Sequence, residues 1–177
     1  LKVGGPAEIF FQPEDEDDLS FFLKNLETNI PIFVIGACSN LIIRDGGIPG
    51  VVIKLGKNFA KIRQNKTDIA VGAAWRASYL AQTCAKEGVD FSFLRTIPGN
   101  LGGAVKMNAG CYGSYMSDYL IGITLIKRDG SVTDMKASDL KFSYRDSTIP
   151  DDAIITNVLL RKEIDDPLRI EMKMTRA

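Results

Sequence analysis

The fourteen residues from Ile97 to Gly110 constrain the fold more than any other part of the sequence. They contain four glycines and several other small residues. Glycine permits backbone conformations and close approaches that a side chain would block. A purely structural segment would not need so much exposed backbone, so we predict a ligand-binding loop here. A helix is expected to start at about Gly102, which would place its first N–H groups beside the ligand.

A second segment of small residues directly follows the apolar stretch 31–35, which is typical of a buried strand. Successive free N–H groups in such a turn form a cradle for an anion, typically phosphate. The segment is neither a P-loop nor the dinucleotide motif that opens a helix, because an extended stretch is expected after it. An ordinary structural turn is the alternative interpretation. The candidate ligand-binding residues are Gly36, Ala37, Cys38, Ser39, Asn40 and Leu41.

A third group of residues, 142–147, contains Arg145 next to Tyr144 and Asp146. Arginine is permanently charged, and its forked donors suit a carboxylate or a developing enolate oxygen. An ordinary surface pair between Arg145 and Asp146 is the competing interpretation. The residues alone favour that surface pair.

Composition excludes several classes of function. Lys+Arg and Asp+Glu are both 22, so the overall charge does not suggest nucleic acid or an anionic membrane as a partner. Histidine is absent, which removes Ser-His and Cys-His nucleophiles and most zinc sites. Three widely spaced cysteines do not suggest a disulfide framework. If the chain is catalytic, a cofactor is expected to carry the chemistry, without a metal.

Hydrophobic periodicity predicts a mixed α and β chain. One helical stripe carries Leu19, Phe22, Leu23 and Leu26 behind an acidic cluster that suits a helix N-terminus. Strands are expected at 7–11, 31–35, 41–43, 51–55, 68–72, 121–126, 131–135 and 153–160, and further helical segments at 75–87, 138–140 and from 166 onward.

These motifs occur together, in one order, along nearly the whole chain, and that ordered set is more specific than any one of them. It comprises Gly4-Gly5-Pro6-Ala7, Gly36 to Leu41, Arg44 to Gly47, Ile97-Pro98-Gly99, Gly102-Gly103, Asn108 to Gly113 and Ser143-Tyr144-Arg145. In this respect the chain closely resembles the UDP-N-acetylenolpyruvoylglucosamine reductases, also called UDP-N-acetylmuramate dehydrogenases. Single positions depart from the family pattern, with Ala37, Cys38, Thr96 and Asn100 standing where other residues are usual.

The resemblance implies a two-lobed α+β FAD-binding fold of the vanillyl-alcohol-oxidase type. Lobe 1 would cover 1–56, lobe 2 would cover 57–164, and 165–177 would form a linker helix towards a substrate-binding domain that is absent from this chain. FAD would lie between the lobes, with its pyrophosphate on the two glycine-rich loops. The implied cofactor-binding residues in the second loop are Ile97, Pro98, Gly99, Asn100, Gly102, Gly103, Asn108 and Ala109.

The implied reaction reduces UDP-N-acetylglucosamine-enolpyruvate to UDP-N-acetylmuramate, with NADPH as co-substrate and hydride passing through FAD. Arg145 matches the family's catalytic arginine and would hold the substrate carboxylate, with Tyr144 lining the same region. The family's serine proton donor and its assisting glutamate have no match here, so this segment alone is expected to be inactive. We expect a cytoplasmic monomer that acts in peptidoglycan synthesis, and hence in cell shape and division.

Three alternatives stay open on the sequence. The chain could belong to another FAD-dependent oxidoreductase of the same fold, although those often attach flavin through histidine, which is absent. It could be an FAD-binding module without catalysis. It could also be a plain structural α+β domain, in which case changes at Gly99 or Gly102 would affect only stability.

Overall fold

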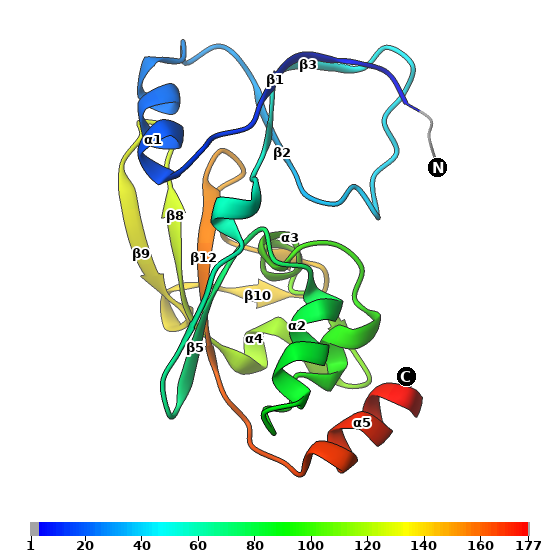
Figure 1. Cartoon of the computed structure of the whole chain (residues 1–177). Coiled ribbons are helices and arrows are strands. Elements are labelled where there is room, and N and C mark those ends of the chain that lie inside the picture. The colour runs from blue at the N-terminus through cyan, green and yellow to red at the C-terminus, as the bar shows by residue number, and fades with distance from the viewer. Residues whose placement is uncertain (1–3, 177) are drawn as a thin grey trace.

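A small parallel sheet with one helix forms the N-terminal part of this computed structural model, which describes residues 4–176. The strands are β1 (Ala7–Phe11), β2 (Ile32–Ile35) and β3 (Ile48–Lys54), and their order is β1-β3-β2. The helix α1 (Glu16–Asn25) lies beside them at the upper left of Figure 1.

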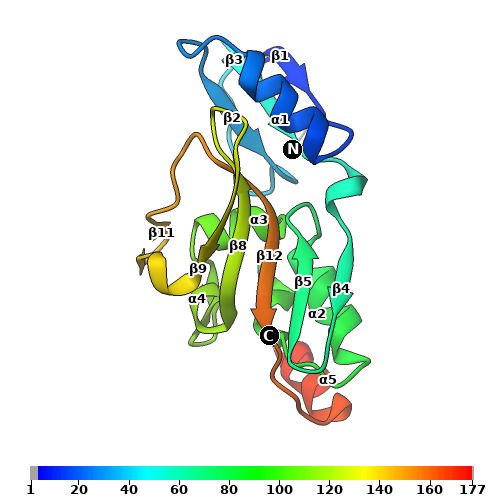
Figure 2. The same cartoon turned by 90° about the vertical axis from the view of Figure 1, so that its left-hand side faces the viewer.

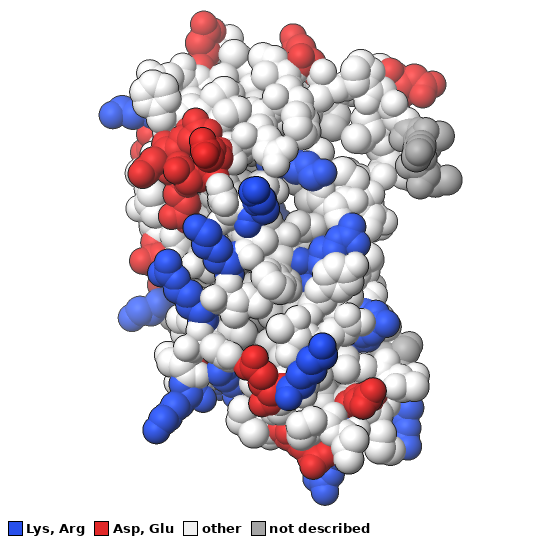
Figure 3. Space-filling model, viewed as in Figure 1, with Lys and Arg blue, Asp and Glu red and all other residues white. Residues whose placement is uncertain are grey.

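Helix α1 follows the predicted pattern. The side chain of Asp15 caps it by accepting a hydrogen bond from the N–H of Asp18 at 2.9 Å. Leu19 and Leu23 are buried in one hydrophobic cluster with Val51 and Ile53 of the sheet, so the apolar stripe faces the core. The acidic side chains gather over the start of the helix, where its dipole favours negative charge (Figure 3).

A five-stranded antiparallel sheet forms the larger part of the molecule, in the order β4-β5-β12-β8-β9 (Figure 2). Its three main helices lie on one face of this sheet (Figures 1 and 2). The strands are β4 (Ile62–Gln64), β5 (Asp68–Gly72), β8 (Leu120–Ile126), β9 (Val132–Lys136) and β12 (Ile154–Arg161), and the helices are α2 (Ala77–Ala85), α3 (Leu101–Lys106) and α4 (Met116–Tyr119).

Helix α2 confirms the predicted apolar stripe and the predicted helix end at a glycine. Ala77, Leu80, Ala81 and Cys84 are all buried in the larger hydrophobic cluster. Burial raises the pKa of the Cys84 thiol to about 12, so it stays protonated near neutral pH. Gly88 has a φ of +73°, which terminates the helix in a left-handed turn.

Short elements connect these layers, and the sequence predicted few of them. Strands β8 and β9 confirm the predicted hairpin around Asp129-Gly130, and the 3-10 turn η3 lies in the predicted place. The short elements are η1 (Lys57–Phe59), η2 (Ser92–Thr96), β6 (Gly110–Cys111), β7 (Ser114–Tyr115), η3 (Ala137–Asp139), β10 (Phe142–Ser143) and β11 (Asp146–Ser147).

The predicted strand at Leu41–Ile43 is wrong. These residues adopt no regular structure, and Ile42 is 90% exposed. The small sheet holds only β1, β3 and β2 among the described residues, and Leu41–Ile43 pairs with neither of the outer strands β1 and β2. The segment therefore runs as an open loop from β2 to the turn that precedes β3.

Helix α5 (Pro167–Arg176) begins with the predicted proline and docks through an ion cluster. The ammonium group of Lys173 lies 2.5 Å from a carboxylate oxygen of Asp90 and 2.8 Å from one of Asp165. Ile170 is buried on the same helix. The cluster thus joins α5 to the segment that leads into η2.

Acidification is expected to loosen α5. Burial raises the pKa of Asp90, but hydrogen bonds from Lys173 and Ser92 outweigh burial and bring it below 3.8; the hydrogen bond from Lys173 also lowers the pKa of Asp165. Because both folded-state values are depressed, this stabilisation is complete above about pH 4 and is lost as pH falls further. The pKa of Lys173 is raised, so its contribution is lost only well above pH 10. Hydrogen-exchange protection of α5 at pH 6 and pH 3 measures the effect, and Lys173→Met should remove the difference.

Two further features concern a membrane and a metal ion as possible partners. Across residues 4–176, no helix combines the length and apolar character that a membrane span requires. Over the same residues, no three acidic, cysteine or histidine side chains gather as a metal site would need. The proposed boundaries of the two lobes and the linker stay a prediction.

Candidate cofactor and substrate site

The two glycine-rich segments meet in the structure although about sixty residues separate them in the sequence. A side chain at Gly36 would place its Cβ 3.2 Å from the Cβ, Cγ and Oδ1 atoms of Asn100. A side chain at Gly99 would place its Cβ 3.1 Å from Oγ of Ser39. Two glycines therefore allow the loop after β2 to touch the loop before α3, and the predicted convergence is confirmed.

The first loop leaves its backbone donors free. None of the N–H groups from Ala37 to Asn40 donates a hydrogen bond to any residue in the range 4–176. Cys38 takes a φ of +53°, a conformation that glycine adopts more easily. Such a run of unpaired N–H groups in a turn suits an anionic group, because donors without a partner gain most from one.

The second loop, by contrast, uses backbone N–H groups in hydrogen bonds within the protein. The N–H groups of Leu101 and Gly102 donate to the carbonyl oxygens of Trp75 and Ala73, at 2.8 and 2.9 Å. The expectation that the first N–H groups of α3 face a ligand is therefore wrong for these two residues. The side chain of Ile97 is 6% exposed and belongs to the core, so only its backbone could reach a ligand.

Two buried polar atoms at this junction lack a partner among the described residues. They are Oδ1 of Asn100, an acceptor, and Nε1 of Trp75, a donor. The side-chain amide of Asn100 also donates to the carbonyl of Ala74 at 2.6 Å. A buried polar atom without a partner is costly, so the junction suits a ligand that carries both donors and acceptors. From the sequence, Trp75 was expected only to start a helix, and its place directly before α2 is the one signal that could have suggested more.

The third motif lies against the end of the second glycine-rich segment. A guanidinium nitrogen of Arg145 donates to the carbonyl oxygen of Gly110 at 3.4 Å. The guanidinium carbon lies 5.3 Å from the centre of the Tyr144 ring, within cation–π range. Both side chains are exposed, and no ion pair joins Arg145 to Asp146 among the described residues, so the competing surface pair is wrong.

Asn108 and Ala109, both predicted to bind the cofactor, use their backbone donors inside the protein. Their N–H groups donate to the carbonyl oxygens of Val105 and Ala104 at 3.0 and 2.7 Å. Asn108 is 6% exposed, and both ends of its side chain have protein partners. Their hydrogen bonds hold neighbouring segments of the protein together, and cofactor binding by these two residues stays a prediction.

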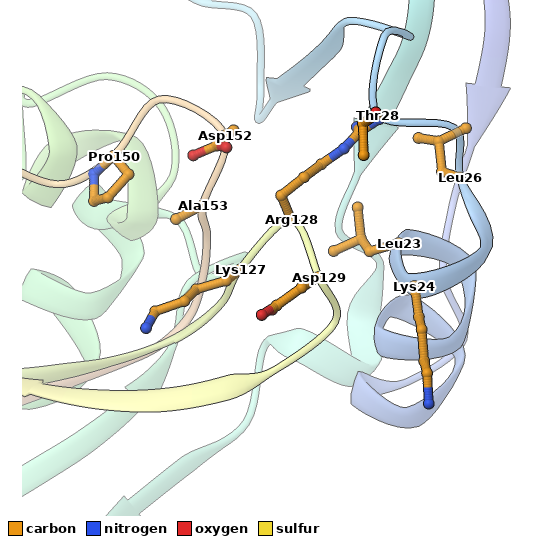
Figure 4. Close-up of a pocket in the computed structure, with 10 residues that line it drawn as sticks. All are labelled: Leu23, Lys24, Leu26, Thr28, Lys127, Arg128, Asp129, Pro150, Asp152 and Ala153. Carbon is orange, nitrogen blue, oxygen red and sulfur yellow. The ribbon is translucent and has the colours of Figure 1, made fainter.

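A pocket of about 570 Å³ lies elsewhere, between α1 and the β8–β9 hairpin (Figure 4). Neither glycine-rich segment lines it. The ammonium groups of Lys24 and Lys127 point in different directions, and Arg128 points towards Thr28 (Figure 4). Because its cations do not converge, the pocket does not form an anion site.

Comparison with known proteins agrees with this geometry. Residues 7–136 match the family described as "FAD binding domain". The chain is 47% identical over 174 residues to UDP-N-acetylenolpyruvoylglucosamine reductase of Paracoccus denitrificans, covering 98% of this chain and 57% of that protein. The chain therefore spans little more than half the length of this curated relative.

Two solved structures share the arrangement. The UDP-N-acetylenolpyruvylglucosamine reductase of Thermus caldophilus superposes with a TM-score of 0.86 at 33% identity, covering 98% of this chain and 62% of that one. The BBE-like 1 protein of Physcomitrella patens superposes with a TM-score of 0.62 at 18% identity, covering 88% of this chain and 36% of that one. The second likeness concerns the fold alone.

Proposed function

Because the chain belongs to the FAD-binding domain family, we propose that it is the flavin-holding part of an NADPH-dependent reductase. Its fold is the two-lobed α+β FAD-binding fold of the vanillyl-alcohol-oxidase type. The substrate that we propose is UDP-N-acetylglucosamine-enolpyruvate, and the product is UDP-N-acetylmuramate. This proposal draws on the resemblance to the reductases of Paracoccus denitrificans and Thermus caldophilus.

One observation supports FAD most strongly: the first loop, which has free N–H donors, is in contact with the second loop. The N–H groups from Ala37 to Asn40 suit the diphosphate, which offers only acceptors. Oδ1 of Asn100 suits a hydroxyl group of the cofactor, because an acceptor needs a donor. Bound FAD supplies the two-electron chemistry that passes a hydride from NADPH to the substrate.

Arg145 carries the substrate part of the proposal. Negative charge grows on the enolpyruvyl carboxylate as the hydride arrives at the terminal vinyl carbon, and it is discharged when the carbon next to the carboxylate takes up a proton. A permanently charged guanidinium beside that carboxylate lowers the barrier, because it is in place before the charge develops. The exposed side chains of Tyr144 and Arg145 are available to a substrate and to further chain around it.

The remaining parts of the proposal rest on the same resemblance. We propose that proton transfer to the substrate uses a serine and a glutamate outside this segment, so that the segment alone does not turn over substrate. A cytoplasmic monomer that serves peptidoglycan synthesis, and thereby cell shape and division, completes the proposal. It needs neither nucleic acid nor a membrane as a partner.

The test of the function uses the full-length gene product under anaerobic conditions. NADPH should reduce the bound flavin, and the enolpyruvyl substrate should then restore the oxidised absorbance spectrum rapidly. If NADPH reduces the flavin but the substrate leaves it reduced, the chain is a flavoprotein of another function. A protein that takes up no flavin would overturn the whole proposal.

Cys38 provides a test of the first loop that does not depend on turnover. Its side chain is exposed, whereas Cys84 is buried and its thiol has a raised pKa. Iodoacetamide should therefore modify Cys38 in the FAD-free protein and leave Cys84 unmodified until the protein unfolds. FAD should slow the modification, and riboflavin, which lacks the diphosphate, should not. Equal modification rates with and without FAD, measured by peptide mass spectrometry, would place the diphosphate elsewhere.

A further inference from the structure

Helix α3 ends in a backbone turn that glycine could form without any side chain. Asn108 takes a φ of +39°, its N–H donates to Val105, and the N–H of Ala109 donates to Ala104. This pair of bonds is the Schellman motif, in which the left-handed residue is usually glycine. Helix α2 ends in the same way, with the left-handed position filled by Gly88. Asparagine also fits this turn, so the contacts of its side chain decide whether it has a further role.

The side chain of Asn108 has such a role, because it joins two neighbouring segments. Its Oδ1 accepts a hydrogen bond from the N–H of Ser117 at 3.1 Å, and its Nδ2 donates to the carbonyl oxygen of Ser143 at 3.2 Å. The residue is 6% exposed, so water competes little for these bonds. One buried amide thus connects the end of α3 to α4 and to strand β10.

Ser143 is the last residue before the turn that presents Arg145. Strands β10 and β11 pair Ser143 with Asp146, which leaves Tyr144 and Arg145 as the two-residue turn. Arg145 has a φ of +58°, a strained conformation for a residue with a side chain. Such strain persists only where the surroundings hold it.

The opposite strand of this hairpin is held by the same turn of α3. The hydroxyl of Ser147, which is 8% exposed, donates to the carbonyl oxygen of Lys106 at 2.6 Å. The ammonium group of Lys106 lies 2.8 Å from a carboxylate oxygen of Asp151 and also donates to the carbonyl of Ile149. The C-terminal end of α3 is therefore hydrogen-bonded to both strands of the hairpin. Its N-terminal end begins in the loop that contacts Gly36.

We propose that Asn108 is a positioning residue for Arg145: it fixes the strained turn to the helix that starts in the cofactor loop. Arg145 and the ligand of that loop then share one rigid support, which sets the distance between the guanidinium and the reacting centre. The inference rests on the proposed function for the role of Arg145, but the contact of Asn108 with the hairpin does not depend on it.

The variant Asn108→Gly tests the proposal, because glycine keeps the left-handed turn and removes only the two side-chain bonds. In the full-length protein, exchange of the backbone amides in 142–147 should rise while exchange in 101–106 stays unchanged. Met107→Gly is the matched control: it adds the same backbone freedom one residue earlier, at a side chain that is 46% exposed, and should leave exchange in 142–147 unchanged. Equal hairpin exchange in Asn108→Gly and in the unmodified protein would overturn the proposal.

Kinetics of the same variant separate positioning from general loosening. FAD content and flavin reduction by NADPH should be unchanged, while oxidation of the reduced flavin by the enolpyruvyl substrate should fall about 10- to 100-fold, as for a misplaced catalytic group. Adding Asn108→Gly to Arg145→Ala should cause no further loss, because the residue acts through Arg145. Additive losses in this double-mutant cycle would contradict the proposal. If the unmodified enzyme ignores this substrate, the proposed function fails, and the exchange measurement still decides whether Asn108 holds the hairpin.

Discussion

Replacing Arg145 by alanine in the full-length protein is expected to slow oxidation of the reduced flavin by the enolpyruvyl substrate by about 10²- to 10³-fold. The guanidinium is the permanent positive charge that the structure presents on the β10–β11 turn, and its loss leaves the growing carboxylate charge to solvent. Reduction of the flavin by NADPH should keep its rate, because that half-reaction creates no such charge. Stopped-flow absorbance of the two half-reactions measures both rates.

The conservative change Arg145→Lys and a distant arginine complete that experiment. Lysine keeps the charge but not the forked donors, so it should restore only part of the rate. Arg63→Ala removes an exposed arginine on β4, an outer strand of the five-stranded sheet, and should leave both half-reactions unchanged. A normal rate of reoxidation in Arg145→Ala would remove this residue from the mechanism while leaving the flavin assignment intact.

The variant Gly36→Val is expected to weaken FAD binding by about 10- to 100-fold, because overpacking of this size costs about 1–3 kcal/mol. Its Cβ would lie 3.2 Å from three atoms of Asn100, and the two methyl groups would need still more room. The loops must then separate, which moves the free N–H groups of the first loop away from the second. Quenching of flavin fluorescence on titration of the FAD-free protein gives the dissociation constant.

Gly46→Val is the matched control for this experiment. A Cβ at Gly46 meets no atom within 4 Å, and its φ does not lie in the left-handed region. Affinity for FAD should therefore stay near that of the unmodified protein. The midpoint of urea unfolding should change little in Gly46→Val and fall in Gly36→Val, because the overpacking also strains the FAD-free protein. Unchanged affinity in Gly36→Val would show that the contact between the loops does not shape the binding site.

Local pattern predicted most of the regular structure. The stripe of Leu19 and Leu23, the stripe on α2 and the Asp129-Gly130 hairpin each follow from spacing within a single segment. The strand expected at Leu41–Ile43 is wrong, because an apolar run does not show whether the folded chain brings the segment alongside a pairing partner. The short hairpin of β10 and β11 was not predicted, since two-residue strands leave no measurable period.

The sequence likewise predicted one part of the candidate site and missed another. Glycine density pointed to both loops, and the Tyr-Arg motif pointed to Arg145 once the resemblance supplied its role. The sequence could not distinguish free N–H groups from occupied ones, so it placed the first N–H groups of α3 beside the ligand, although those of Leu101 and Gly102 bond within the protein. Hydrogen-bond partners decide that difference, and those partners lie on the segments 73–75, 104–105, 117 and 143.

The sequence by itself determined the longer helices, most strands, the absence of histidine chemistry and the residue types that could hold an anionic cofactor, because these depend on local spacing and side-chain chemistry. Only the tertiary structure decided that Gly36 meets Asn100, that the first loop keeps its donors free, and that Asn108 grips the turn of Arg145. Each of these is a contact between segments distant in sequence. Such contacts depend on how the two sheets pack, which no local pattern contains.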